Sequence, residues 1–166
     1  MVNIKKVNSI SQLKIISSLA NIIWPICYKT ILTPAQLSYM VQKGYALPVL
    51  QNAFINKTDH FYIAYKNTTP IGYASISATI AAPCKLHKLY VLPTMHGNGA
   101  GKILFNFAKT EAQKQQAPNM FLNVNVANKA VGFYKKQGME ITETLDLMVG
   151  NGYVVTDYIM TLQLLH

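Results

Sequence analysis

The chain has 166 residues, enough for one domain with its own hydrophobic core. Hydrophobic residues make up 51% of the chain and charged residues 13%, which excludes an intrinsically disordered protein. Fifteen basic and six acidic side chains give a formal net charge of +9, a surplus that favours an anionic partner.

The cysteine pattern and the absence of a targeting segment bear on the compartment. Cys27 and Cys84 lie far apart and form no Cys-x-x-Cys pair, which favours a reducing compartment and argues against a structural zinc site. Polar residues interrupt the apolar N-terminal stretch, no cleavage motif follows, and no apolar run is expected to be long enough to span a membrane. The sequence therefore predicts a cytoplasmic protein that binds neither a metal nor a membrane.

The first third of the chain is expected to be helical. Residues 11–23 carry apolar side chains at helical spacing, and Pro25 is expected to end this helix. Residues 33–44 form a second helix with Thr33 as its N-cap and Gly44 as its C-cap. A short third helix covers residues 47–55.

Strands follow the helices. In residues 60–65 the apolar side chains alternate, and the turn "NTTP" connects them to residues 71–80 in an antiparallel hairpin. Residues 85–92 form a third strand that Pro93 closes. Within it, Lys85, His87 and Leu89 are expected to share one face.

The second half alternates between helices and strands. Residues 99–115 form a helix whose core-facing side chains are expected to be Ile103, Leu104, Phe107 and Ala108. The remaining elements are a strand, a helix and two strands around the turn "GNG", over residues 120–126, 128–138, 139–149 and 153–164. Together the elements predict a single α/β (α+β) domain over residues 1–166, with a mostly antiparallel sheet of about six to seven strands flanked by helices.

The glycine-rich segment "HGNGAGK" lies between a strand and a helix. It is not a nucleoside-triphosphate loop, because Gly97 is one position too close to Gly101 and Ile103 replaces the hydroxyl residue. It is not a dinucleotide fingerprint either, because the third glycine would fall at Lys102 or Leu104. What remains is a helix N-terminus with unpaired N–H groups, and this geometry predicts a pyrophosphate site with Lys102 as a supporting cation.

Two segments resemble the GNAT N-acetyltransferase superfamily. "LYVLPTMHGNGAGKILFNFA" is similar to the family's pyrophosphate loop, Gln/Arg-x-x-Gly-x-Gly/Ala, with His96, Gly99 and Gly101 at the three fixed positions. "LNVNVANKAVGFYKKQGM" is similar to the family's second block, with its spacing shifted around Ala130. The beginning and end of the chain resemble the bacterial polyamine-acetyltransferase-like branch.

The resemblance implies that acetyl-CoA is the co-substrate and that Tyr134 is the general acid that protonates the departing thiolate. It also implies a set of acetyl-CoA-binding residues on the third strand, the glycine-rich loop and the second block. These residues are Leu89, Tyr90, Val91, His96, Gly97, Asn98, Gly99, Ala100, Gly101, Lys102, Asn128 and Phe133.

The general base is not identified by the sequence. Many family members carry a glutamate on the third strand, and here that position is Lys85. The candidates that remain are His87, Asp157 and an ordered water molecule.

The sequence thus predicts an N-acetyltransferase that acts on a small amine, a polyamine or a lysine side chain. The alternative is an acyl-CoA-binding sensor that has lost catalysis, which the missing glutamate favours. A nucleic-acid-binding module is disfavoured because the lysines are scattered and no recognition motif appears. The net charge of +9 opposes a polycationic acceptor, and the high hydrophobic content is compatible with a homodimer.

Overall fold

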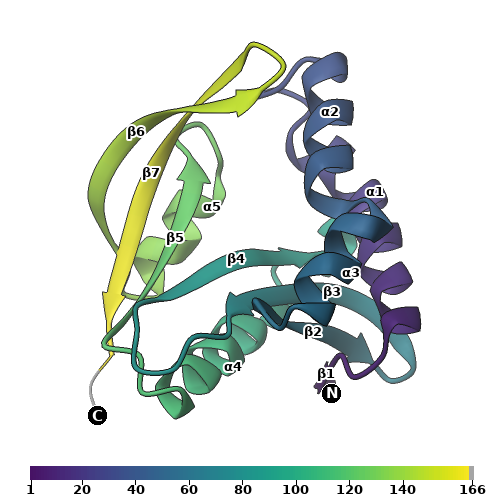
Figure 1. The fold of residues 1–166 in the computed structure, drawn as a ribbon, viewed down its shortest axis with the longest axis vertical. Coiled ribbons are helices and arrows are strands. Elements are labelled where there is room, and N and C mark those ends of the chain that lie inside the picture. Colours follow the sequence, from purple (N-terminus) through teal and green to yellow (C-terminus); the bar gives the residue numbers. More distant parts are fainter. Residues whose placement is uncertain (165–166) are drawn as a thin grey trace.

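The computed structural model describes residues 1–164, so the last two residues of the predicted domain, 165–166, lie outside the described part. A seven-stranded sheet with the order β1-β2-β3-β4-β5-β7-β6 forms the centre of the molecule (Figure 1). Every neighbouring pair is antiparallel except β4 and β5, which are parallel. The predicted fold class is therefore confirmed.

The elements follow the predicted order. The strands are β1 (Val2–Lys6), β2 (Asp59–Lys66), β3 (Thr69–Ser77), β4 (Cys84–Val91), β5 (Asn119–Asn125), β6 (Glu140–Gly150) and β7 (Tyr153–Gln163). The α-helices are α1 (Leu13–Cys27), α2 (Pro34–Tyr45), α3 (Leu47–Ile55), α4 (Ala100–Lys114) and α5 (Ala130–Lys136), and the 3-10 turns are η1 (Ile10–Gln12) and η2 (Pro93–Met95). Strand β1 was not predicted, because its five residues are too short for an alternating pattern to be recognised.

Two predicted helix ends are wrong. Pro25 lies inside α1, which continues to Cys27, because a proline in the last turn removes only one hydrogen-bond donor. Gly44 lies inside α2, and Ala46 is the C-cap. The extra residue of α2 is Tyr45, whose ring is only 3% exposed and packs edge-on against Trp24 and Tyr73. Burial of this ring outweighs the preference of glycine for the C-cap.

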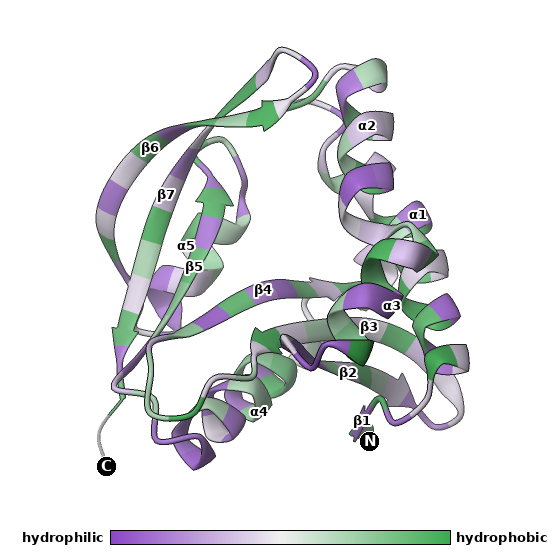
Figure 2. Ribbon diagram, in the orientation of Figure 1, coloured by the Kyte–Doolittle hydropathy of each residue, from purple (hydrophilic) through white to green (hydrophobic). Residues whose placement is uncertain are grey.

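The helices cover both faces of the sheet. Cluster residues of α1 and α3 pack against Phe61, Ile63 and Tyr73 on one face, whereas α4 packs against the other. Figure 2 shows the hydrophobic colouring along β2 and β3 between these layers, whereas the edge strand β6 alternates between hydrophilic and hydrophobic residues. This packing covers β2 and β3 on both faces, so a ligand site has to lie elsewhere along the sheet.

Helix α1 also bears on the membrane prediction. The helical stretch Ile10–Cys27 is long and apolar enough to cross a membrane by length and composition, so the expectation that no run reaches that length is wrong. Leu13, Ile16 and Ile23 of this stretch are fully buried in the core. A core helix of a globular domain can also meet this criterion of length and apolar composition.

The core-facing side of α4 differs from the prediction at one position. Leu104 and Ala108 are buried as predicted, but Ile103 is 43% exposed and Phe105 is buried instead. Phe105 packs against the rings of Phe133 and Tyr134, with centroid distances of 6.1 and 6.2 Å. Helix α5 thus covers a second side of α4, and the periodicity of α4 alone gives no indication of that neighbour.

Leu104 and Ile103 provide a matched pair for a stability test. Leu104→Ala is expected to lower the free energy of unfolding by about 2–5 kcal/mol, because Leu104 is fully buried and truncation leaves a cavity. Ile103→Ala is expected to cost less than about 1 kcal/mol, because Ile103 is exposed. Urea unfolding measures both values, and equal losses would contradict the orientation of α4.

Candidate active site

The site is a cleft at the centre of the sheet. Strands β4 and β5 pair only at Cys84 with Met120 and at Lys85 with Phe121, and beyond these residues the two strands diverge (Figure 1). A cavity of about 1250 Å³ fills the gap, lined by β4, β5, the loop before α4, helix α5 and the segment between α1 and α2. The interrupted pairing leaves backbone groups of both strands available to a ligand.

A β-bulge in β4 decides which side chains face the cleft. Ser75 of β3 pairs with Lys88 and Ile76 pairs with Leu86, so His87 is the extra residue. The bulge puts Leu86 and Leu89 on the core face, where both pack in the same cluster. The prediction that Lys85, His87 and Leu89 share one face is therefore wrong.

The backbone of β4 beyond the bulge alternates in direction. Leu92 N–H donates to Ile71 O at 2.8 Å, and bonds in an antiparallel ladder recur at every second residue. The backbone of Tyr90 is therefore directed at Tyr73 of β3, its register partner. The N–H and C=O groups of Leu89 and Val91 face the gap beside β5.

The glycine-rich loop ends in the first turn of α4. Gly97 and Gly99 each have a φ of +78°, a left-handed conformation that a side chain would strain, and an added Cβ at either would meet no atom within 4 Å. The N–H groups of residues 97–102 donate to no acceptor among residues 1–164, and the first helical bond runs from Ile103 N–H to Gly99 O. These unpaired donors and the positive end of the helix dipole are available to an anionic ligand.

The other predicted loop residues have different positions. The side chains of His96 and Lys102 line the cleft with Gly97, Gly99 and Gly101. The His96 ring bonds through Nε2 to Val91 O at 3.0 Å, so this side chain connects the loop to the end of β4. Asn98 and Ala100 do not line the cleft, and Ala100 is buried in the core.

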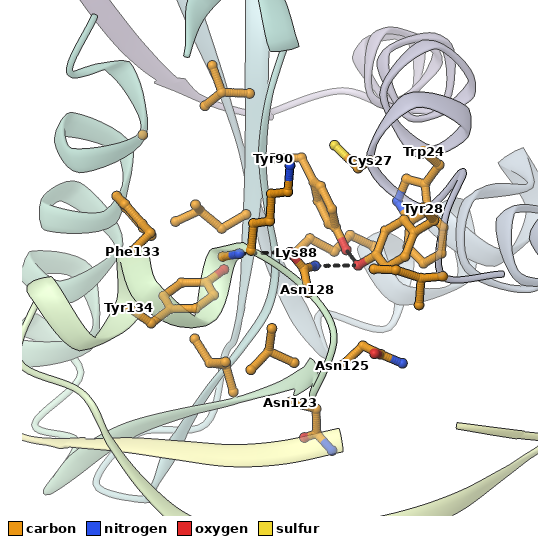
Figure 3. Close-up of a pocket in the computed structure, with 18 of the residues that line it drawn as sticks. Trp24, Cys27, Tyr28, Lys88, Tyr90, Asn123, Asn125, Asn128, Phe133 and Tyr134 are labelled. Carbon is orange, nitrogen blue, oxygen red and sulfur yellow. Dashed lines mark hydrogen bonds between the residues drawn. The ribbon is translucent and has the colours of Figure 1, made fainter. Parts of the chain in front are cut away.

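Tyr134 lies on α5 and lines the cleft, with its hydroxyl directed into it (Figure 3). Its ring packs against Phe133 at 5.3 Å between centroids and is 7% exposed. Burial raises the pKa of the Tyr134 hydroxyl above its ordinary value, and nearby Tyr28 raises it further. The hydroxyl forms no hydrogen bond with another described residue, so it is available to a ligand.

Asn128 belongs to a polar network that sequence analysis did not identify. Its Oδ1 accepts from Ala130 N–H at 2.8 Å, and its Nδ2 donates to the Tyr28 hydroxyl at 3.3 Å. The Tyr28 and Tyr90 hydroxyls are 2.8 Å apart (Figure 3). Lys129 is the N-cap residue of α5, although the Asn128 carboxamide satisfies an N–H group at that end.

Aromatic rings form one wall of the cleft. Trp24 and Tyr28 stack at 4.3 Å between ring centroids, and the rings of Tyr45 and Tyr90 lie against Trp24. The Tyr73 ring packs against Tyr45 and Tyr90 but is fully buried and does not line the cleft. These residues come from α1, its C-cap position, α2 and two strands, so no local pattern in the sequence could have identified them as a cluster.

Charged side chains lie at the opposite end of the cleft from the loop. Lys88 Nζ is 4.6 Å from the centroid of the Tyr45 ring, and burial lowers the pKa of the Lys88 amine. Burial raises the pKa of the Asp157 carboxyl, while the charge of Lys85 lowers it. His87 Nε2 is 3.8 Å from the Asp59 carboxylate, and burial lowers the pKa of its ring.

Within residues 1–164, no group of three or more His, Cys, Asp or Glu side chains could hold a metal ion. Cys27 and Cys84 are both free thiols in this structure, Cys27 half-buried and Cys84 buried.

Comparison with known proteins identifies a family. A family model described as "Acetyltransferase (GNAT) domain" matches residues 33–162. A Mycobacterium tuberculosis protein named as an uncharacterized N-acetyltransferase is 34% identical over 95 residues, which are 57% of this chain and 60% of that protein. The peptidyl-lysine N-acetyltransferase YjaB of Salmonella typhimurium is 35% identical over 74 residues, 44% of each chain. The match thus spans less than two thirds of these curated relatives.

The fold is also found among solved structures. The PaiA N-acetyltransferase of Thermoplasma acidophilum, solved in complex with coenzyme A, superimposes with a TM-score of 0.82 over 99% of both chains. Its sequence is 22% identical to this one, so the similarity concerns the fold.

Proposed function

The chain belongs to the acetyltransferase (GNAT) domain family, and on that premise we propose that it transfers the acetyl group of acetyl-CoA to a primary amine. The observation that carries the proposal is the set of unpaired N–H groups of residues 97–102 beside the gap between β4 and β5. The coenzyme A complex of the Thermoplasma acidophilum protein supports it.

The donor is held by backbone groups. The pyrophosphate is bound by the N–H groups of the loop residues that line the cleft, Gly97, Gly99, Gly101 and Lys102. The dipole of α4 adds partial positive charge, and the Lys102 side chain adds a full one. The backbone groups of Leu89 and the N–H of Val91 face the pantetheine arm and the thioester, whereas Val91 O is bonded to the His96 ring. An N–H group at this point stabilises the negative charge that develops on the thioester oxygen.

The proton for the departing thiolate comes from Tyr134. As the amine nitrogen forms a bond with the carbonyl carbon, the C–S bond breaks and the sulfur takes the hydroxyl proton. Burial raises the pKa of Tyr134, so the hydroxyl remains protonated at neutral pH.

Asp157 is the proton acceptor that we propose for the amine. An alkylamine with a pKa of about 10.4 is only about one part in 2,500 neutral at pH 7, so a base raises the rate. Asp157 lines the cleft, and burial raises the pKa of its carboxyl, which makes it a stronger base. His87 also lines the cleft, but its Nε2 lies 3.8 Å from the Asp59 carboxylate, so that this ring faces another acidic group.

The pH dependence of thiol release tests this function. In the wild-type protein, kcat/KM should fall on the acid side only below the pKa of Asp157, which lies above the ordinary value of about 3.9. Above it the carboxylate accepts the proton of the ammonium group, so the profile is flat until the amine itself titrates. Asp157→Asn should lower kcat/KM at pH 7 by roughly 100-fold.

The variant should also change the shape of the profile. Without the base, the reaction needs free neutral amine, so kcat/KM should rise about tenfold per pH unit through the neutral range. Asp146→Asn is the control, because this exposed carboxylate bonds to Thr156 outside the cleft. If Asp157→Asn keeps the wild-type profile, the proton goes to water or to His87.

A further inference from the structure

The end of the cleft opposite the glycine-rich loop contains two cations without an ion pair. We call this end the acceptor chamber and define it by Tyr28, Tyr45, Lys85, Lys88 and Asp157, all of which line the cleft. Neither lysine has a carboxylate oxygen within salt-bridge distance among residues 1–164. Asp59 and Asp157 act on them only at longer range.

The donor phosphates do not explain these cations. The pyrophosphate loop begins after Val91, whereas Lys88 lies three residues earlier along β4 and Lys85 six residues earlier. At about 3.3 Å per residue, these side chains start roughly 10 and 20 Å upstream of the end of the strand. The pyrophosphate therefore does not balance the charge of Lys85 and Lys88.

Lys88 is held in place without a counter-ion. Its Nζ lies 4.6 Å from the centroid of the Tyr45 ring, and Figure 3 shows the side chain extending alongside Tyr90. Burial lowers the pKa of the Lys88 amine, as expected for a cation that lacks a close anion. An anionic group that entered the chamber would form a charge-assisted hydrogen bond in a desolvated site.

The distribution of charge also argues against a polycationic acceptor. Lys43, Lys85 and Lys88 line this half of the cleft, and Asp157 is the one carboxylate among the lining residues. A polyamine would bring several positive charges toward them. An acceptor with one ammonium and one anionic group instead fits Asp157 and Lys88 together.

The chamber is roofed, which limits the size of its occupant. The Tyr39 hydroxyl of α2 donates to Val149 O at 3.2 Å, and Lys43 Nζ donates to the same carbonyl. The rings of Tyr39 and Tyr153 lie 5.5 Å apart. The tip of the β6–β7 hairpin therefore rests on α2 (Figure 1), which favours a small molecule over a protein loop.

From these observations we propose that the acceptor is a small amine that also bears a carboxylate or a phosphate, with its anionic group on Lys88 and its ammonium group beside Asp157. The inference rests on the proposed acetyl transfer, and it narrows the acceptor to amines of this kind.

Matched ligand pairs test the proposal by calorimetry on protein saturated with coenzyme A. The carboxylate pairs are L-leucine with L-leucinamide and L-phenylalanine with its amide; the phosphate pair is 2-aminoethyl phosphate with ethanolamine; spermidine represents polyamines. At least one anionic member should bind roughly 10- to 100-fold more tightly than its neutral partner. The pair that responds distinguishes carboxylate from phosphate.

Variants at Lys88 test whether this side chain causes the preference for the anionic member of each pair. Lys88→Met should abolish the preference for the anionic member, Lys88→Arg should retain most of it, and the affinity for coenzyme A should not change in either variant. Lys66→Met is the control, because Lys66 is exposed at the end of β2. Equal or tighter binding of the neutral members or of spermidine, or no binding by any anionic member, would overturn the inference.

Thiol release from acetyl-CoA with the same compounds separates this inference from the proposed function. If thiol release is fastest with spermidine or with a neutral amine, the protein is an acetyltransferase but its acceptor is not an anionic amine. Selective binding of an anionic amine without thiol release from any compound supports the charge assignment and contradicts acetyl transfer.

Discussion

Gly99→Val is expected to lower the affinity for acetyl-CoA by at least about 100-fold. Gly99 has a φ of +78°, and a β-branched residue is strained there by about 1–3 kcal/mol. An added Cβ meets no protein atom within 4 Å, so the new side chain occupies the open space in front of the N–H groups. The loss follows because several hydrogen bonds to a charged group, each worth about 1.5–3 kcal/mol, are removed together.

Gly152→Val is a matched control for this experiment. Gly152 has a φ of +76° and equally open surroundings, but it lies in the β6–β7 turn. The two variants should lose similar stability, whereas only Gly99→Val should lose affinity for acetyl-CoA. Calorimetric titration with acetyl-CoA measures the difference, and unchanged binding by folded Gly99→Val protein would show that the anion site lies elsewhere.

Tyr134→Phe is expected to lower kcat by roughly 100- to 10,000-fold. The variant removes only the hydroxyl that we propose as the proton donor to the departing thiolate, and the ring retains its packing against Phe105 and Phe133. Because this hydroxyl has no hydrogen-bond partner among the described residues, stability and acetyl-CoA affinity should stay within about twofold of wild type.

Steady-state thiol release, together with thermal unfolding, separates a catalytic role from a structural one. Tyr65→Phe serves as the control. Tyr65 belongs to β2, its ring lies beside the Lys5 side chain of β1, and it does not line the cleft. If the Tyr134→Phe variant keeps the wild-type kcat, the proton that the departing thiolate takes up comes from solvent and not from Tyr134.

The predictable parts of this molecule are those that depend on nearby residues. The first turn of α4 and its glycines could be predicted, because an anion site at a helix N-terminus needs only a short segment of chain. The helix cap at Thr33 could be predicted for the same reason, and its side chain accepts from Gln36 N–H.

The unpredicted parts depend on contacts between distant residues. The bulge at His87 changes which side chains of β4 face the cleft, and only the pairing with β3 reveals it. The exposure of Ile103 depends on where α5 packs, and the extension of α2 through Gly44 depends on burial of Tyr45. The cleft wall formed by Tyr28, Tyr45 and Tyr90 joins three separate segments.

Lys85 has a new interpretation in this arrangement. The sequence suggested that the lysine at this position could mark a protein without catalysis. In the structure Lys85 lies in the cleft, where its charge lowers the pKa of Asp157. The acid and the base that we propose, Tyr134 and Asp157, both line the cleft, so the proposal needs no glutamate on β4. This supports an enzyme over a sensor.

The most direct test of the account is acetyl transfer itself. Purified protein is incubated with acetyl-CoA and the panel of amines, the free thiol is quantified, and mass spectrometry identifies the acetylated amine. The account predicts equal amounts of coenzyme A thiol and of one N-acetylated product, with both lost in Tyr134→Phe. Tight binding of acetyl-CoA with no acetylated product from any amine would contradict it and would identify an acyl-CoA-binding domain.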